Sequence, residues 1–165
     1  MRVIRDVARP NASPLRRLHG GRAVIGADHL ETLTADGGAI RACLARIRGF
    51  LLRSDLAPET CGTIEIVLAE VLNNLAEHAY PANAPGPVHV TLSREASLMH
   101  VTIRDHGAPL PGLCLPKGAA PVLDVARTEL PEGGFGWFLI RTLAHDLEYR
   151  REGEENRLSF VILCA

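Results

Sequence analysis

The segment from Thr63 to Tyr80 most constrains what this chain can fold into. Its apolar residues recur at the three- and four-residue spacing of an amphipathic helix, and they are Ile64, Val67, Leu68, Val71, Leu72 and Leu75. A second arc of the same helix carries the polar residues Glu70, Asn73, Asn74, Glu77 and His78. Residues four positions apart lie nearly above one another on a helix. The segment therefore predicts a helix with one buried stripe and one polar arc.

The polar arc has two interpretations. Two consecutive asparagines are mediocre helix formers, and an ordinary solvent-facing arc uses Lys, Arg, Glu and Gln instead. A carboxylate one turn from an amide oxygen, as in Glu70 and Asn74, is what a hard cation and a proton acceptor need. A plain solvent-facing helix explains this segment, taken alone, about as well.

The composition excludes several classes of protein. With 165 residues, 47% of them hydrophobic, the chain can form one folded domain. Its 18 basic and 19 acidic residues give no basic field for non-specific nucleic-acid binding. No apolar run is long enough to span a bilayer, and the N-terminal segment lacks the apolar core of a secretory signal. The chain is therefore expected to be cytoplasmic.

The number and spacing of the cysteines agree with a cytoplasmic protein. They are Cys43, Cys61, Cys114 and Cys164, with no Cys-x-x-Cys pair and no zinc-like spacing. We expect reduced, buried thiols.

The chain divides into an N-terminal arm, residues 1–22, and one domain, residues 23–165. The arm is Arg-rich and interrupted by prolines, which is typical of a loose tail or a short strand with a loop. Within the domain, helices are expected over 36–52, 63–80 and about 136–145, and β-hairpins over 88–104 and 147–163. Residues 108–131 are irregular and proline-rich, with a short helix possible near 122–128.

This order of elements predicts the fold class. Strands come as antiparallel pairs, and helices are inserted between the pairs. The expectation is an α+β, two-layer sandwich with helices on one face of a mixed, mostly antiparallel sheet.

Two further motifs lie outside the helix. Asp105, at a strand end, can accept a hydrogen bond from an exocyclic amine such as N6 of adenine, and Gly107 leaves room for a flat base. Gly134 and Gly136 lead into a helix whose N–H groups and dipole favour a phosphate. The second motif is neither a Walker A loop nor a dinucleotide fingerprint, because Leu139 stands where the third glycine should be. Taken singly, each is equally an ordinary turn.

The three motifs occur in the order of one ATP site. EVLNNLAEHAY, IRDHGAPLP and GGFGWFLIRTLAHDLEYRREGEENRLSF together resemble the N-box and the two glycine boxes of the GHKL ATPase superfamily. The chain is most similar to its anti-sigma factor serine/threonine kinase family, over about residues 36–163. The resemblance implies the Bergerat ATP-binding fold.

The resemblance also implies a role for individual residues. Asn74 matches a Mg²⁺ ligand, and Glu70 matches the carboxylate that acts on the attacking hydroxyl as base or orienter. Asp105, with Gly107 beside it, matches the adenine-reading aspartate. Gly134 and Gly136 match the phosphate-loop glycines. His78 matches a family histidine and is expected to pack against a helix, whereas Asn73 is expected at a polar surface.

The implied function is that of an ATP- and Mg²⁺-dependent protein kinase in a partner-switching system. It would phosphorylate a Ser or Thr of a small anti-sigma factor antagonist, and it would sequester a sigma factor or a similar regulator. The resemblance is compatible with a homodimer. Two alternatives stay open: a non-catalytic ATP-binding sequestration module, and the separate catalytic domain of a histidine kinase. Neither nucleic acid nor membrane is an expected direct partner.

The sequence departs from the family pattern at several points. Pro109 stands where many members have a second glycine, and Trp137 follows the last glycine of the second box, where leucine is common. Proline stiffens that loop and removes a donor. A cationic phosphate clamp in the irregular segment could come from Lys117 or Arg127.

Overall fold

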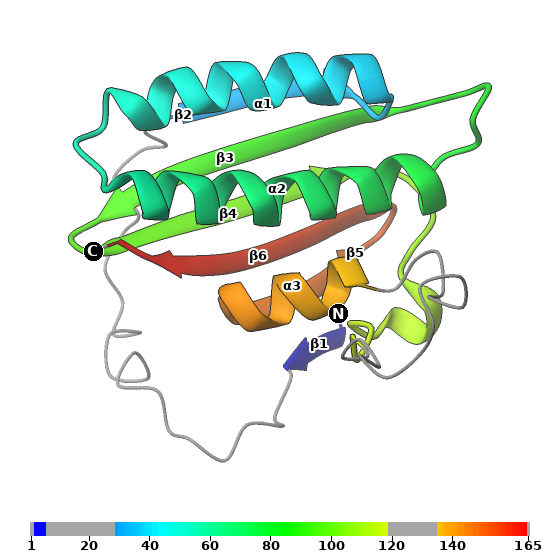
Figure 1. Ribbon diagram of the computed structural model, residues 1–165. Helices are drawn as coiled ribbons and strands as arrows, with labels where there is room; N and C mark the ends of the chain where they lie inside the picture. Colours follow the sequence, from blue (N-terminus) through cyan, green and yellow to red (C-terminus); the bar gives the residue numbers. More distant parts are fainter. Residues whose placement is uncertain (1, 6–28, 119–134, 165) are drawn as a thin grey trace, which may run out of the picture.

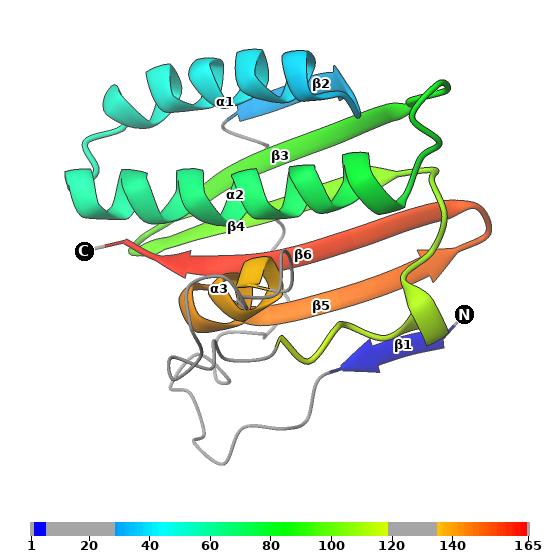
Figure 2. The same ribbon diagram turned by 45° about the vertical axis from the view of Figure 1, so that its right-hand side comes forward.

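The computed structural model describes residues 2–5, 29–118 and 135–164. These residues form two layers, a six-stranded sheet and three α-helices that lie together on one of its faces (Figures 1 and 2). In chain order the elements are β1 (Arg2–Arg5), β2 (His29–Thr34), α1 (Gly37–Leu52), α2 (Pro58–His78), β3 (Pro87–Glu95), β4 (Leu98–Asp105), η2 (Pro111–Leu113), α3 (Phe135–Leu143), β5 (His145–Glu152) and β6 (Glu155–Leu163). The predicted α+β sandwich is confirmed.

The sheet has the strand order β1-β5-β6-β4-β3-β2. Every described pairing is antiparallel, so the sheet is not mixed within these residues. Both predicted hairpins are present, as β3 with β4 and β5 with β6. The register places Asp105 opposite Asn156, which brings the first glycine motif beside the C-terminal hairpin.

The first two helices begin where their local sequence requires. Asp36 caps α1, because its Oδ1 accepts hydrogen bonds from the backbone N–H groups of Gly38 and Ala39 at 3.0 and 2.9 Å. Pro58 opens α2, where a missing N–H and a fixed φ suit the first helical turn. The second helix thus starts earlier than the polar and apolar pattern alone predicts.

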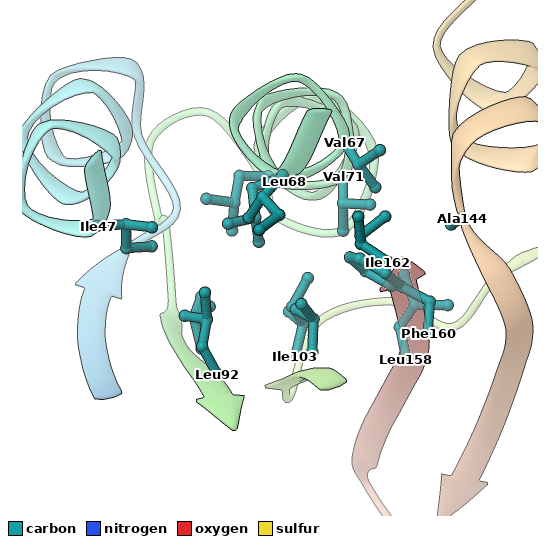
Figure 3. Packing of buried hydrophobic residues seen from close by; sticks show 14 of the residues in the cluster. Ile47, Val67, Leu68, Val71, Leu92, Ile103, Ala144, Leu158, Phe160 and Ile162 are labelled. Carbon is teal, nitrogen blue, oxygen red and sulfur yellow. The ribbon is translucent and has the colours of Figure 1, made fainter. Parts of the chain in front are cut away.

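The core lies between the helices and the sheet. The apolar stripe predicted for α2 is buried through Ile64, Val67, Leu68, Val71 and Leu72, with Leu75 half-buried beside it. Figure 3 shows side chains of α2 pointing toward those of β4 and β6. Alternate residues of the strands complete this layer, among them Val90, Leu92, Val101, Ile103, Leu158, Phe160 and Ile162. Trp137 packs against this core from α3.

The strand β2 is an element that the sequence analysis missed. It adds to the edge of the sheet beside β3, and it carries a buried carboxylate at Glu31. Oε1 of Glu31 lies 2.9 Å from Nε2 of His29, and Oε2 accepts a hydrogen bond of 2.8 Å from Nε of Arg46 on α1. This carboxylate therefore ties the edge strand to the first helix.

Several expectations lie outside the described residues. They are the short helix near 122–128, the arm beyond its strand β1, and the domain boundary at residue 23, which stays a prediction. None of the helices in the described ranges combines the length and the hydropathy that crossing a bilayer demands.

Candidate functional site

The site is centred on the contact between α2 and α3. A Cβ added to Gly136, in the first turn of α3, would lie 2.5 Å from Oε2 of Glu70 and 3.6 Å from Nδ2 of Asn74. The carboxylate and the amide of α2 therefore both face the glycine at the start of α3. The polar arc of α2 is not a uniform solvent-facing surface at this point, since a second helix packs against it.

The amide of Asn74 is unusual in its environment. Its Nδ2 is buried and has no hydrogen-bond partner among the described residues. A buried amide normally finds a partner, because leaving it unpaired costs on the order of 1–3 kcal/mol. An amide can also turn over and present its oxygen at the same place. The unpaired group is consistent with an Asn74 that binds something at the start of α3.

The N-terminal turn of α3 carries backbone N–H groups that the helix itself does not pair. The first N–H groups of a helix have no partner within the helix, and the dipole makes that end positive. Gly118 approaches the same turn closely, because a Cβ there would lie 2.8 Å from the backbone nitrogen of Phe138. Arg141 holds the preceding segment against α3 by donating to the carbonyl oxygens of Pro116 and Leu115 at 2.6 and 3.3 Å. Gly134 lies outside the described residues.

Asp105 ends β4 and is buried, with 3% of its surface exposed. Its Oδ1 accepts hydrogen bonds from the backbone N–H of Gly107 at 2.8 Å and from Nδ2 of Asn156 at 2.9 Å. Its second carboxylate oxygen receives no hydrogen bond from the described residues. A buried carboxylate with one oxygen saturated by donors retains an acceptor for a ligand N–H.

Gly107 is required by packing against the end of α2. A Cβ at this position would lie 2.6 Å from the backbone oxygen of Ala79, which accepts a hydrogen bond of 2.7 Å from the N–H of Ala108. The close approach therefore joins the residue after α2 to the segment that follows β4. The glycine is needed here whether or not a base also lies against it.

A network of polar side chains supports this end of the sheet, and the sequence analysis missed its roles. The carbonyl oxygen Oδ1 of Asn156 accepts from the hydroxyl of Tyr149 at 2.7 Å and from Nη1 of Arg151 at 2.6 Å. Burial raises the pKa of the Tyr149 hydroxyl, so this group keeps its proton at neutral pH. No local sequence signal indicates these roles, because they depend on the pairing of β4 with β6, which places Asn156 opposite Asp105.

Tyr80 makes a second connection at the same end. Its hydroxyl lies 3.1 Å from the carbonyl oxygen of Pro87, to which it donates, and accepts from the backbone N–H of His106 at 3.0 Å. The side chain therefore links the end of α2 to the start of β3 and the end of β4. Burial raises the pKa of this hydroxyl as well.

Two expectations about side chains were wrong. His78 does not pack against a helix, because its side chain is 72% exposed and lies 3.8 Å from the carboxylate of Glu77. Cys114 is exposed and not buried, whereas Cys43, Cys61 and Cys164 are buried as expected. Asn73 is exposed, as predicted.

The two candidates for a cationic phosphate clamp are described only in part. Lys117 is exposed, and Arg127 falls outside the described residues. A shallow cavity of about 490 Å³ is lined by Phe50, Ser54, Arg94, Ala96 and Met99, and it includes none of the predicted site residues. We therefore assign the candidate site to the α2–α3 contact and to the end of β4.

Comparison with known proteins identifies the class of protein that this fold and site define. The sequence model of the histidine kinase-like ATPase domain matches residues 33–162, so the chain belongs to that family. The predicted resemblance to GHKL ATPases is confirmed.

The curated relatives narrow the class further. Serine/threonine-protein kinase BtrW of Bordetella bronchiseptica is 33% identical over 98 residues, which cover 59% of this chain and 66% of that protein. The anti-sigma F factor of Bacillus licheniformis is 25% identical over 101 residues, or 61% of this chain and 67% of that protein. The chain thus spans about two thirds of the length of these relatives. The first is named as a serine/threonine kinase and the second as an anti-sigma factor.

The fold also has a counterpart among solved structures. The crystal structure of the RsbU and RsbW domains of Rv1364c from Mycobacterium tuberculosis matches with a TM-score of 0.57 at 14% identity. The match covers 82% of this chain and 31% of that one. At this identity the match shows the fold alone, and that fold is the predicted one.

Proposed function

We propose that the chain is an ATP-dependent serine/threonine protein kinase of a partner-switching system. The observation that carries this proposal is the meeting of Glu70 and Asn74 with Gly136 at the start of α3. Membership of the histidine kinase-like ATPase family supports ATP as the nucleotide, and the serine/threonine kinase among the relatives supports the acceptor type.

The donor set fits a nucleotide with its metal. The oxygen of the Asn74 amide would hold Mg²⁺, and Mg²⁺ commonly takes only one or two protein ligands beside phosphate oxygens and water. The absence of a side chain at Gly136 lets the Glu70 carboxylate approach the start of α3. We propose that Gly134 leaves room for the phosphates. Asp105 would accept from the 6-amino group of adenine, with Gly107 beside it. When bound, Mg²⁺ supplies charge neutralisation along the triphosphate.

The remaining step belongs to Glu70. Its carboxylate receives no hydrogen bond from the described residues, so it is available to a ligand. We propose that it accepts the proton of the attacking serine or threonine hydroxyl, or orients that hydroxyl. Phosphoryl transfer depends mostly on such positioning and on charge neutralisation.

The partners follow from the same proposal. The substrate would be a small anti-sigma factor antagonist, whose added phosphate weakens its docking by like-charge repulsion and desolvation. The chain would then sequester a sigma factor or a similar regulator, and a homodimer is the proposed assembly. The anti-sigma F factor among the relatives supports this branch.

A transfer assay with radiolabelled ATP and a candidate antagonist tests the kinase. We expect Glu70→Ala to lower transfer by about 100-fold or more while ATP still binds. Asn74→Ala should remove the part of ATP affinity that depends on Mg²⁺. Glu77→Ala and Asn73→Ala are matched controls, because both residues are exposed on the same helix. Full transfer by both site variants would refute the mechanism.

The same assay separates the second candidate function, a sequestration module that binds ATP without transferring phosphate. The anti-sigma F factor relative favours that function, because its name describes binding and not transfer. ATP binding by calorimetry without any phosphotransfer would support it. Acid-labile phosphate on the target would instead indicate histidine kinase chemistry.

A further inference from the structure

We propose that Tyr149 and Arg151 are positioning residues that set the preference for a 6-aminopurine by fixing the amide of Asn156 against Asp105. The inference rests on the proposed function, in which Asp105 contacts the base. It adds two residues of β5 whose hydrogen bonds, among the described residues, go to Asn156, Gly107 and Leu110 and not to Glu70, Asn74 or Gly136.

The first step concerns the orientation of the Asn156 amide. A primary amide has one accepting end and one donating end. Its oxygen lies against two donors, the Tyr149 hydroxyl at 2.7 Å and Nη1 of Arg151 at 2.6 Å. Its nitrogen lies against two acceptors, Oδ1 of Asp105 at 2.9 Å and the carbonyl oxygen of Gly107 at 3.1 Å. Turning the amide over would oppose like groups at the contacts with Arg151, Asp105 and Gly107, so one orientation is favoured, and the Tyr149 hydroxyl adds a donor to it.

The second step concerns Asp105. With the backbone N–H of Gly107 at 2.8 Å, the Asn156 amide saturates Oδ1 with donors. Because both donors bind the same oxygen, they fix the rotation of the carboxylate. The other oxygen can then accept from an exocyclic amine. A base that presents an oxygen at position 6 would place two acceptors against each other.

The third step concerns charge. Asp105 and Asn156 are each only 3% exposed, so water screens the carboxylate poorly. The guanidinium of Arg151 donates to Asn156 Oδ1 and, at 3.1 Å, to the carbonyl oxygen of Gly107. Within the hydrogen-bonded network of the described residues, it is the cation that polarises the amide toward Asp105.

The fourth step concerns the Tyr149 hydroxyl. It accepts from the backbone N–H of Leu110 at 3.2 Å and donates its one proton to Asn156. Leu110 directly precedes η2, so the hydroxyl joins the amide to the segment that follows the first glycine motif. Removing the hydroxyl frees both the amide and that segment.

The experiment compares ATP with purine riboside triphosphate, which lacks only the 6-amino group. In calorimetric titrations we expect the unmodified chain to prefer ATP by about tenfold or more, since an unpaired buried acceptor costs roughly 1–3 kcal/mol. In Tyr149→Phe and in Arg151→Met the preference should fall by at least fivefold. Binding of purine riboside triphosphate should change by less than twofold. GTP should gain affinity relative to ATP in both variants.

Arg157→Met is the matched control, because Arg157 lies exposed on the neighbouring strand β6. It should keep the full preference. Arg151→Lys should restore part of it, since one donor and the charge remain. If Arg151→Met fails to fold, Tyr149→Phe and Arg151→Lys suffice for the comparison.

The outcomes separate this inference from the proposed function. An unchanged preference in Tyr149→Phe and Arg151→Met, or an equal loss for both nucleotides, overturns the positioning role alone. If the unmodified chain shows no preference for ATP over purine riboside triphosphate, and Asp105→Asn behaves in the same way, the base contact at Asp105 is overturned. This inference is then overturned with it.

Discussion

Glu70 and Gly136 are so close that one added carbon on the glycine would meet the carboxylate at 2.5 Å. The two residues belong to α2 and α3, which are far apart in the sequence. The carboxylate of Glu70 occupies the place that a side chain at position 136 would take, so this glycine is what allows the proposed site to form.

Gly136→Ala should therefore damage function much more than stability. The obstructing atom is the end of a flexible side chain, so Glu70 can turn away without moving the backbone. Alanine is also a better helix former than glycine. We expect ATP affinity and phosphotransfer to fall by about tenfold or more, with thermal unfolding nearly unchanged. Gly62→Ala in α2, where a Cβ meets nothing within 4 Å, is the control.

Gly107→Ala should instead damage stability more than function. The added Cβ would meet the backbone oxygen of Ala79 at 2.6 Å, and neither backbone can yield without weakening the hydrogen bond from Ala108. Overpacking of this kind costs about 1–3 kcal/mol. Urea denaturation measures the loss, and Gly37→Ala, with open space around it, should show none. A fully stable Gly107→Ala would contradict the packing described here.

Asp36→Ala should destabilise the chain by about 1 kcal/mol, because it removes both hydrogen bonds that cap α1. Asp36→Asn keeps an accepting oxygen, so its loss of stability should be only a few tenths of the loss in Asp36→Ala. Chemical denaturation of the three proteins checks the order. Nucleotide binding should not change, since Asp36 makes no contact with the site residues.

Stability should decrease at alkaline pH, in part through Cys43. Burial, aided by the charge of Glu31, raises the pKa of this thiol from 9.0 to about 11. Between these values the unfolded chain releases the proton and the folded chain keeps it, so the free energy of unfolding falls as pH rises. The loss is on the order of 2 kcal/mol by pH 11.

The measurement for Cys43 is urea denaturation from pH 8 to 11. Cys43→Ala should lower the starting stability by leaving a small cavity and should flatten the alkaline slope. The slope should not vanish, because burial also raises the pKa of Cys61 and Cys164. An identical slope in the variant would argue against this assignment.

Local patterns were sufficient to predict most of the fold. The periodicity of α1 and α2 and the alternation in both hairpins depend on neighbouring residues only, and all four appear as expected. The strand β2 was not predicted, because one of its inward-facing residues is Glu31, whose burial depends on Arg46 in the next helix. No local pattern reveals a partner 15 residues away.

The site residues also divide into those that local sequence predicts and those that depend on distant partners. Glu70, Asn74 and Gly136 could be grouped from motif order, and they do meet. Asn156, Tyr149 and Arg151 could not, because their roles depend on strand register and on hydrogen bonds across the sheet. The packing of His78 was predicted wrongly for a related reason. Helical spacing predicts that His78 lies on the same side of α2 as Glu70 and Asn74, but it does not predict where a neighbouring helix ends.

The position of β6 has a consequence for biosynthesis. This strand lies between β4 and β5, yet it follows every other strand of the sheet along the chain. A nascent chain that lacks it would expose the unpaired edge of β4, and Asp105 would have no Asn156 beside it. Nucleotide binding by an emerging polypeptide must therefore wait until the C-terminal hairpin has left the ribosome.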